Sequence, residues 1–229
     1  MTSISSSHTQ RGHIARLVSN QVPRKVLRDV TNRLKYGVQG PKSDECLFLD
    51  PASINLRFVA KDPYDVMDFR RKNSGEVRDG DWDLIARPLL DDIKFQSCKA
   101  RFLDGVAWED TPIFAKLSEE IAQGGSPDDC HTIDDLKLRY QNLDKLWDIV
   151  TRTQELKPKT QLPDFFRREH GGIFVHLNRH GQAMRYGGGM HRFSIARLAK
   201  LPAIPVQVGV VHKDFVLSGN YARLRQKPS

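Results

Sequence analysis

The sequence predicts an α/β protein with a mixed sheet, a helical insertion and an N-terminal helix. Residues 173–177 alternate in the manner of a strand, and a short turn leads to a return strand over 182–186. Three glycines then precede an amphipathic helix and a last alternating strand that begins at Ile204. Helical periodicity recurs in the middle of the chain, so both element types are expected.

The first helix is expected to begin near Pro23 and to end at Gly37, because proline suits a first helical turn and glycine suits a helix end. Its apolar residues form one stripe at helical spacing: Val26, Leu27, Val30 and Leu34. We expect this stripe to dock on the protein body and to leave a solvated basic face. The alternative is that the basic face meets an anionic partner.

A short strand follows over 46–54 and turns at Asp50-Pro51, since proline cannot donate to a sheet ladder. Residues 70–83 are polar and contain glycine, and they predict a loop with Trp82 as its buried anchor. The stretch 84–104 gives no clear pattern.

Two helices are expected in the middle of the chain. Thr111 is placed to cap a helix that starts at Pro112. Thr132 and Asp135 resemble a capping box that opens a long helix through about Thr153. We treat the region of about 98–160 as a helical insertion into the sheet domain.

The C-terminal third has the clearest pattern. Gly181 suits the left-handed position of a three-residue hairpin loop. The helix after the glycines stops at Leu201-Pro202. One face of the final strand is expected to carry every second residue: Ile204, Val206, Val208 and Val210.

The positive charge of the chain is concentrated at its two ends. The 229 residues include 36 Lys and Arg against 28 Asp and Glu, a formal net charge of +8. Residues 1–43, a basic arm and helix, carry +7, and the basic tail 213–229 carries +3. The body, 44–212, carries −2, which argues against a uniformly basic domain that coats nucleic acid.

No apolar run approaches the roughly 18 residues that a membrane span requires, and the first 20 residues lack the apolar core of a secretory signal. Their serine and arginine content without acids also fits a transit peptide. The three cysteines are far apart and odd in number, which does not suit a disulfide framework. We therefore expect a cytoplasmic protein.

The segment Gly187-Gly188-Gly189 between a strand and a helix suits phosphate binding. Glycine lets the backbone approach a ligand closely, and a helix start presents unpaired N–H groups. His191 and Arg192 follow at once and could donate charge-assisted hydrogen bonds to phosphate. The alternative is a tight structural turn that carries a surface His-Arg pair.

The stretch YGGGMHRFSIARLAKLPAIPVQV, residues 186–208, resembles the ParB/sulfiredoxin superfamily. Its members have a glycine-rich turn, a His-Arg or Arg-Arg pair, a small amphipathic helix and a strand with Ile-Pro-Val. The strand over 47–54 is similar to the opening strand of that family. The resemblance implies a ParB/sulfiredoxin-like mixed sheet, with the helical region lying outside the shared part.

The resemblance also implies nucleotide phosphates held by Gly189, His191 and Arg192. ATP, ADP or CTP with Mg²⁺ is the expected ligand. Met190 stands where sulfiredoxins have their cysteine, and a thioether cannot serve as a thiolate nucleophile. Chromosome-partitioning members need a helix-turn-helix domain downstream, and only about 20 residues follow the last strand here.

Phosphoryl transfer would require a base and carboxylates opposite the phosphates. The candidates are Glu76 and Asp81, with Asp79 and Asp83 beside them in one acidic loop. A calcium loop is rejected because Leu84 occupies the position of its glycine. The alternative is an acidic surface loop anchored by its tryptophan. We predict no protein-held metal centre; the alternative is a metal pair of His176 and His180, which straddle the hairpin turn.

The sequence thus favours a nucleotide-binding protein in which Glu76, Asp81 and His191 would be catalytic if phosphoryl transfer or nucleotide hydrolysis occurs. Gly187, Gly188, Gly189, His191 and Arg192 would bind the nucleotide. The alternative is a non-catalytic or regulatory protein that uses its basic ends on nucleic acid or another polyanion.

Overall fold

The computed structural model describes residues 22–61, 68–162 and 172–226. In this part the chain is mixed α/β, with one seven-stranded mixed sheet and six α-helices, which confirms the α/β class. The arm expected over 1–21 lies outside the described residues. No helix in the described ranges is both long and apolar enough to cross a membrane.

The sheet has the strand order β1-β7-β5-β6-β2-β4, and β3 adds to the end of β7. The strands are β1 (Cys46–Leu49), β2 (Leu56–Phe58), β3 (Val77–Arg78), β4 (Ala86–Pro88), β5 (Ile173–Leu177), β6 (Ala183–Arg185) and β7 (Ile204–His212). The β5–β6 hairpin and the strand after the glycine turn form as the sequence predicts. Strand β2 pairs in parallel with β6, which brings two distant parts of the chain together.

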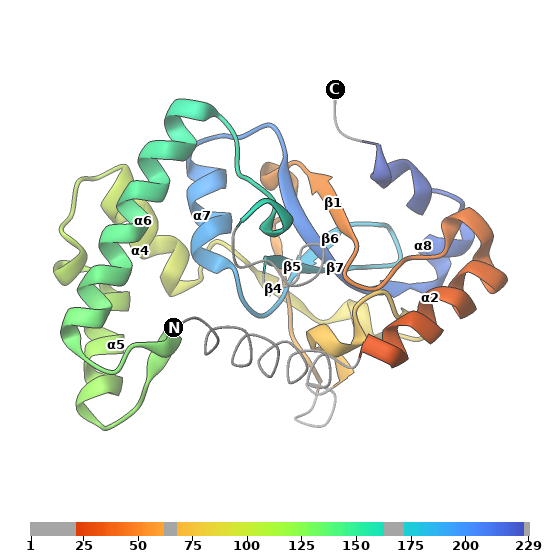
Figure 1. Cartoon of the computed structure of the whole chain (residues 1–229), viewed down its shortest axis with the longest axis horizontal. Coiled ribbons are helices and arrows are strands. Elements are labelled where there is room, and N and C mark those ends of the chain that lie inside the picture. Colours follow the sequence, from red (N-terminus) through yellow and green to blue (C-terminus); the bar gives the residue numbers. More distant parts are fainter. Residues whose placement is uncertain (1–21, 62–67, 163–171, 227–229) are drawn as a thin grey trace, which may run out of the picture.

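The helices are α2 (Val22–Tyr36), α4 (Ile93–Phe102), α5 (Pro112–Ala122), α6 (Ile133–Thr153), α7 (Met190–Leu198) and α8 (Lys213–Leu217). Thr111 caps α5, and Thr132 with Asp135 forms the expected capping box of α6. Figure 1 shows α4, α5 and α6 grouped at one end, with α7 between them and the sheet and α2 at the other end.

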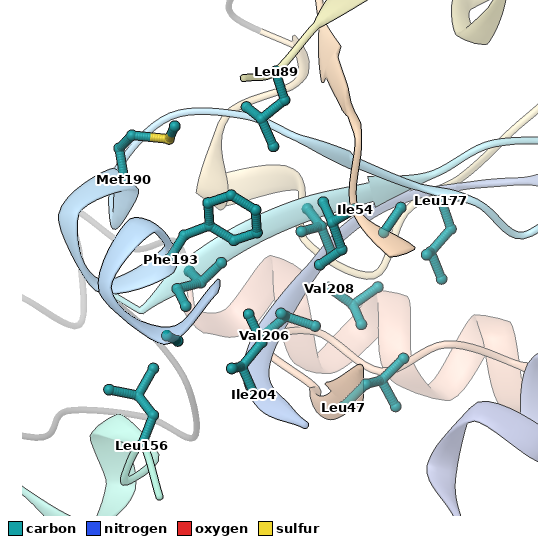
Figure 2. Close-up of a cluster of buried hydrophobic side chains, with 14 of the residues drawn as sticks. Leu47, Ile54, Leu89, Leu156, Leu177, Met190, Phe193, Ile204, Val206 and Val208 are labelled. Atoms are coloured by element: carbon teal, nitrogen blue, oxygen red, sulfur yellow. The ribbon is translucent and has the colours of Figure 1, made fainter. Parts of the chain in front are cut away.

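The main core lies between α7 and the sheet. Figure 2 shows Phe193 of α7, Leu47 of β1 and Val206 of β7 in this cluster. A second cluster fills the space among α4, α5 and α6. A third, on the other face of the sheet, includes Phe58 and Val210.

The position of Val210 corrects the predicted alternation. The β5–β7 register passes from Val175 opposite Val208 to Leu177 opposite Val211, so a bulge shifts β7 by one residue. Val210 therefore leaves the face of Val208 and joins the third cluster. The Val210 N–H, freed from the ladder, donates to His176 Nδ1 at 2.9 Å.

The orientation predicted for α2 is wrong. Its apolar stripe faces outward, and Leu34 is 82% exposed. The buried side is polar: Lys25 forms an ion pair with Asp44 at 2.8 Å, with both side chains fully buried. Asn32 donates to the backbone oxygens of Pro41 and Gly75. Polar contacts hold the helix because the surface under it consists of backbone groups and a buried carboxylate.

Candidate functional site

A pocket of about 540 Å³ opens at the carboxyl ends of β2 and β6, beside the first residue of α7. The glycine turn contributes Gly187 and the helix contributes Met190. The remaining apolar and aromatic lining consists of Phe58, Leu89, Phe174 and Tyr186. The expected location next to the glycines is therefore a real concavity.

Four arginines and a single aspartate give the pocket a strong positive charge. The arginines are Arg57, Arg70, Arg71 and Arg185. Arg57 pairs with the aspartate, Asp92, at 3.1 Å. One carboxylate among four guanidinium groups leaves an excess of positive charge, which favours an anionic ligand.

Arg185 is the most unusual of these residues, because it is a cation with only 2% of its surface exposed. Within the described residues its oxygen partners are the backbone carbonyls of Phe174, Tyr186 and Gly187, at 2.7, 2.9 and 3.1 Å. None of these is a carboxylate, and its Nε is buried without a partner. Burial, with a further contribution from nearby Arg71, lowers the pKa of Arg185 to about 9.

Arg71, the first residue of the short 3-10 helix Arg71–Asn73, lines the same pocket. Its guanidinium donates to the side-chain oxygen of Gln207 and to the backbone oxygen of Gly172. It also lies over the ring of Phe174, 4.9 Å from the centroid. These contacts fix a cation at the wall of the pocket.

The glycine turn has the backbone conformations that the sequence suggests. Gly187 and Gly189 have φ of +62° and +86°, values that side-chain-bearing residues rarely adopt. A Cβ on Gly189 would lie 2.9 Å from the backbone oxygen of Gly172, whereas Gly187 is open. Gly189 is the N-cap of α7. The turn thus places the helix start close to the pocket.

His191 and Arg192 do not line the pocket, contrary to the sequence prediction. His191 is buried against Tyr140 of α6, with ring centroids 5.6 Å apart, and burial lowers its pKa to about 4. Arg192 donates to the backbone oxygen of Lys157. Successive helix residues point about 100° apart, so Met190 lines the pocket while His191 meets α6.

The acidic candidates also lie outside the pocket lining. Glu76 pairs with Arg78 at 2.7 Å. Asp81 pairs with Arg179 at 2.8 Å and borders a separate hollow of about 190 Å³. The structure therefore does not bring Glu76 or Asp81 to the glycine turn, and arginines neutralise both.

Asp83 and Arg179 join the acidic loop to the β5–β6 hairpin. The Asp83 carboxylate is almost fully buried and accepts from Arg179 at 2.7 Å, and these bonds outweigh burial and lower its pKa. His212 Nε2 bonds the backbone oxygen of Gly80 at 2.8 Å. The loop is thus an anchored structural element.

His176 and His180 are not brought together as a metal pair. His176 is fully buried among aromatic rings, and burial lowers its pKa to about 3. His180 is exposed on the hairpin loop. In residues 22–61, 68–162 and 172–226, no three His, Cys, Asp or Glu side chains are grouped to hold a metal ion.

Several cations of the basic ends are engaged with the body. Lys25 is buried with Asp44, and Arg28 donates to the backbone oxygen of Ser74 at 2.7 Å. In the tail, Arg225 pairs with Glu45 and Lys213 pairs with Asp79 at 2.8 Å. These residues are structural contacts, which weakens the alternative in which they contact nucleic acid.

Comparison with family models, with curated proteins and with solved structures gives no match for this chain. Sequence reasoning missed the arginines of the pocket because they come from three separate segments. One signal was present: Arg185 is a charged residue within a buried strand, two residues before Gly187.

Proposed function

We propose that the chain binds a nucleotide in the arginine pocket, and that its sheet and glycine turn represent a ParB/sulfiredoxin-like fold. The observation that carries this proposal is the environment of Arg185. A guanidinium group removed from water, with no carboxylate partner and an unpartnered Nε, is costly to keep. A bound phosphate would offset this cost.

The other arginines suit the same ligand. Guanidinium groups bind phosphate oxygens in a bidentate manner, and Arg57, Arg70 and Arg71 line the same pocket as the buried Arg185. The helix start at Met190 adds unpaired backbone N–H groups. We expect the di- or triphosphate to lie among these groups.

The remaining walls suit a nucleoside. Phe58, Phe174 and Tyr186 provide aromatic surface, and a volume of about 540 Å³ is within the usual range for small-ligand sites. Aromatic rings stack on any base without selecting its sequence identity. The proposal is therefore phosphate recognition by arginines together with a base held by stacking.

The proposal is limited to binding because the three catalytic candidates do not reach the pocket. Glu76 and Asp81 are paired with arginines elsewhere, and His191 is buried against Tyr140 of α6. Asp92 is the carboxylate in the pocket lining, and Arg57 engages it. Mg²⁺ would enter with the phosphates, since it commonly keeps water and phosphate as ligands.

Calorimetric titration with ATP, ADP, CTP and inorganic pyrophosphate, with and without Mg²⁺, tests the proposal. Arg70→Ala should weaken binding about tenfold, the usual cost of one charge-assisted hydrogen bond, and Arg185→Met should weaken it further. Arg70 is exposed, so its variant should fold. Arg152→Ala on the exposed side of α6 is the matched control and should bind like the wild type.

Absence of binding for all four probes would reject the proposal. Equal affinities for wild type, Arg70→Ala and Arg185→Met would mean that the ligand binds outside the arginine pocket. Steep salt dependence together with tight binding of DNA, unchanged in both variants, would support the polyanion alternative instead.

A further inference from the structure

Helix α2 presents an apolar ridge to the outside. Its residues Val26, Leu27, Val30 and Leu34 are 53%, 68%, 52% and 82% exposed. Because successive residues are about 100° apart, these four lie within an arc of about 100°. Val38, just beyond the helix, is 59% exposed. A continuous apolar face of this kind is uncommon on a protein surface and marks an interaction site.

The helix cannot rotate to bury this ridge. Lys25 is held by Asp44 at 2.8 Å, and Asn32 donates to two backbone oxygens. Arg28 reaches the backbone oxygen of Ser74 from the same side. The outward orientation of the ridge is therefore a fixed property of the docked helix.

Cations border the ridge on both sides. By helical angle, Arg33 lies beside it on one side, and Arg24 and Lys35 lie on the other; all three are exposed. The one acidic residue of the helix, Asp29, accepts a hydrogen bond from the Ser43 backbone N–H at 2.6 Å. The exposed face of α2 is thus apolar in the middle and positive at its edges.

This charge pattern distinguishes between two candidate partners for the ridge, a second copy of the chain and an anionic lipid surface. A second copy of the chain would bring the same cations together across a two-fold interface, which is unfavourable. An anionic lipid surface offers acyl chains for the ridge and phosphate groups for the arginines and lysine. Lys and Arg side chains beside an apolar face can extend toward the head groups.

We propose that α2 binds peripherally to anionic membrane surfaces. The helix lies flat, with its Val and Leu side chains at the boundary between head groups and acyl chains. Arg24, Arg33 and Lys35 contact lipid phosphates. Since Figure 1 places α2 at the opposite end from α4, α5 and α6, the helical insertion would point away from the lipid.

Co-sedimentation of the full chain with vesicles tests this inference. The vesicles are phosphatidylcholine alone or phosphatidylcholine mixed with phosphatidylserine. The wild type should bind the mixed vesicles, less so at high salt, and should not bind the neutral ones. Leu27→Asp with Leu34→Asp should reduce binding about tenfold or more. Both residues are exposed, so this variant should keep the wild-type circular dichroism and melting temperature.

The matched control is Leu138→Asp with Ile149→Asp on α6, which adds the same two charges at exposed apolar positions, 56% and 45% exposed. It should bind like the wild type. The inference is overturned if the wild type ignores anionic vesicles, if the α2 variant binds unchanged, or if both variants lose binding equally. A wild-type dimer that the α2 variant converts to monomer would instead assign the ridge to a second copy.

Discussion

Gln207 connects Arg71 to the buried carboxylate of Asp44. Its side-chain nitrogen donates to Asp44 Oδ1 at 2.8 Å, while its oxygen accepts from the Arg71 guanidinium. Asp44 also receives Lys25 of α2. One fully buried carboxamide therefore links the carboxylate on which α2 docks to an arginine of the pocket.

Replacing Gln207 should weaken both the docking of α2 and the positioning of Arg71. We expect Gln207→Leu to destabilise the protein by about 1–3 kcal/mol, because Asp44 and Arg71 each lose a buried partner. Pyrophosphate affinity should also fall, since Arg71 would lose one of the contacts that position its guanidinium. Urea unfolding and calorimetry measure the two effects. Gln226→Leu, at an exposed position, is the control. Full affinity in a destabilised Gln207→Leu protein would refute the positioning role.

Breaking the Lys25–Asp44 pair should be costly. Lys25→Met leaves a buried carboxylate without its cation, which typically costs about 3–5 kcal/mol. The double change Lys25→Met with Asp44→Asn should recover part of this loss, because the unpaired charge is removed. Arg24→Met, one residue earlier and exposed, should stay within about 0.5 kcal/mol. Equal unfolding midpoints for the single and double variants would contradict the ion-pair explanation.

Stability should fall as the pH drops from 6.5 towards 4. His176 and His191 have folded pKa values of about 3 and about 4, below the ordinary 6.5, because both rings are buried. Between pH 6.5 and 4 the unfolded chain therefore binds protons at these histidines while the folded chain does not. The contribution to the free energy of unfolding that is present above pH 6.5 is lost as the pH falls through this window. Each histidine should contribute about 1.4 kcal/mol per pH unit there.

His191→Phe should reduce the slope of unfolding free energy against pH by the equivalent of about one proton. The substitution should be tolerated because the ring has no hydrogen-bond partner at Nε2 and packs against Tyr140. Denaturant unfolding at several pH values between 7.5 and 4.5 measures the slope. Leu138→Phe, at an exposed position of α6, introduces no titratable group and should leave the slope unchanged. An unaltered slope in His191→Phe would mean that this histidine titrates normally in the folded protein.

The acidic loop should respond unequally to neutral substitutions. Asp83→Asn should destabilise by about 2–4 kcal/mol, because the buried partner of Arg179 loses its charge. Asp81→Asn should cost less than about 1 kcal/mol, since Asp81 is 65% exposed. Thermal melting and nucleotide titration of both variants check this. If Asp81→Asn abolished nucleotide binding at unchanged stability, Asp81 would belong to the site after all.

The sequence predicted the elements whose signals are local. The capping residues Thr111 and Thr132 and the hairpin glycine Gly181 each act on the adjacent backbone, so their effect can be read from neighbouring residues. The orientation of α2 could not be predicted this way. A periodic stripe indicates that a helix has an apolar face. It does not reveal that the polar side of the helix will contact Asp44 and a set of backbone carbonyls.

The glycine turn indicated the region where the pocket lies, but the sequence did not indicate the arginines that line it. Arg57 and Arg185 meet because β2 pairs in parallel with β6, with Arg57 opposite Arg185 in the register. No local pattern reveals a pairing between strands more than 100 residues apart. The adjacent pair His191 and Arg192 was misleading, because neighbouring helix positions face different surroundings.

Strand β7 contacts β1, β5 and β3, and it comes last in sequence among the strands of the described residues. On a ribosome, β1 would therefore emerge more than 150 residues before the strand against which it pairs. The sheet can close only after β7 has been made, and such long loops slow closure. Until then the apolar residues of β1 and β5 are not covered by β7, so this chain should need protection from aggregation during synthesis. Mutations in β7 should lower the yield of folded protein more than mutations elsewhere that cost the same unfolding free energy.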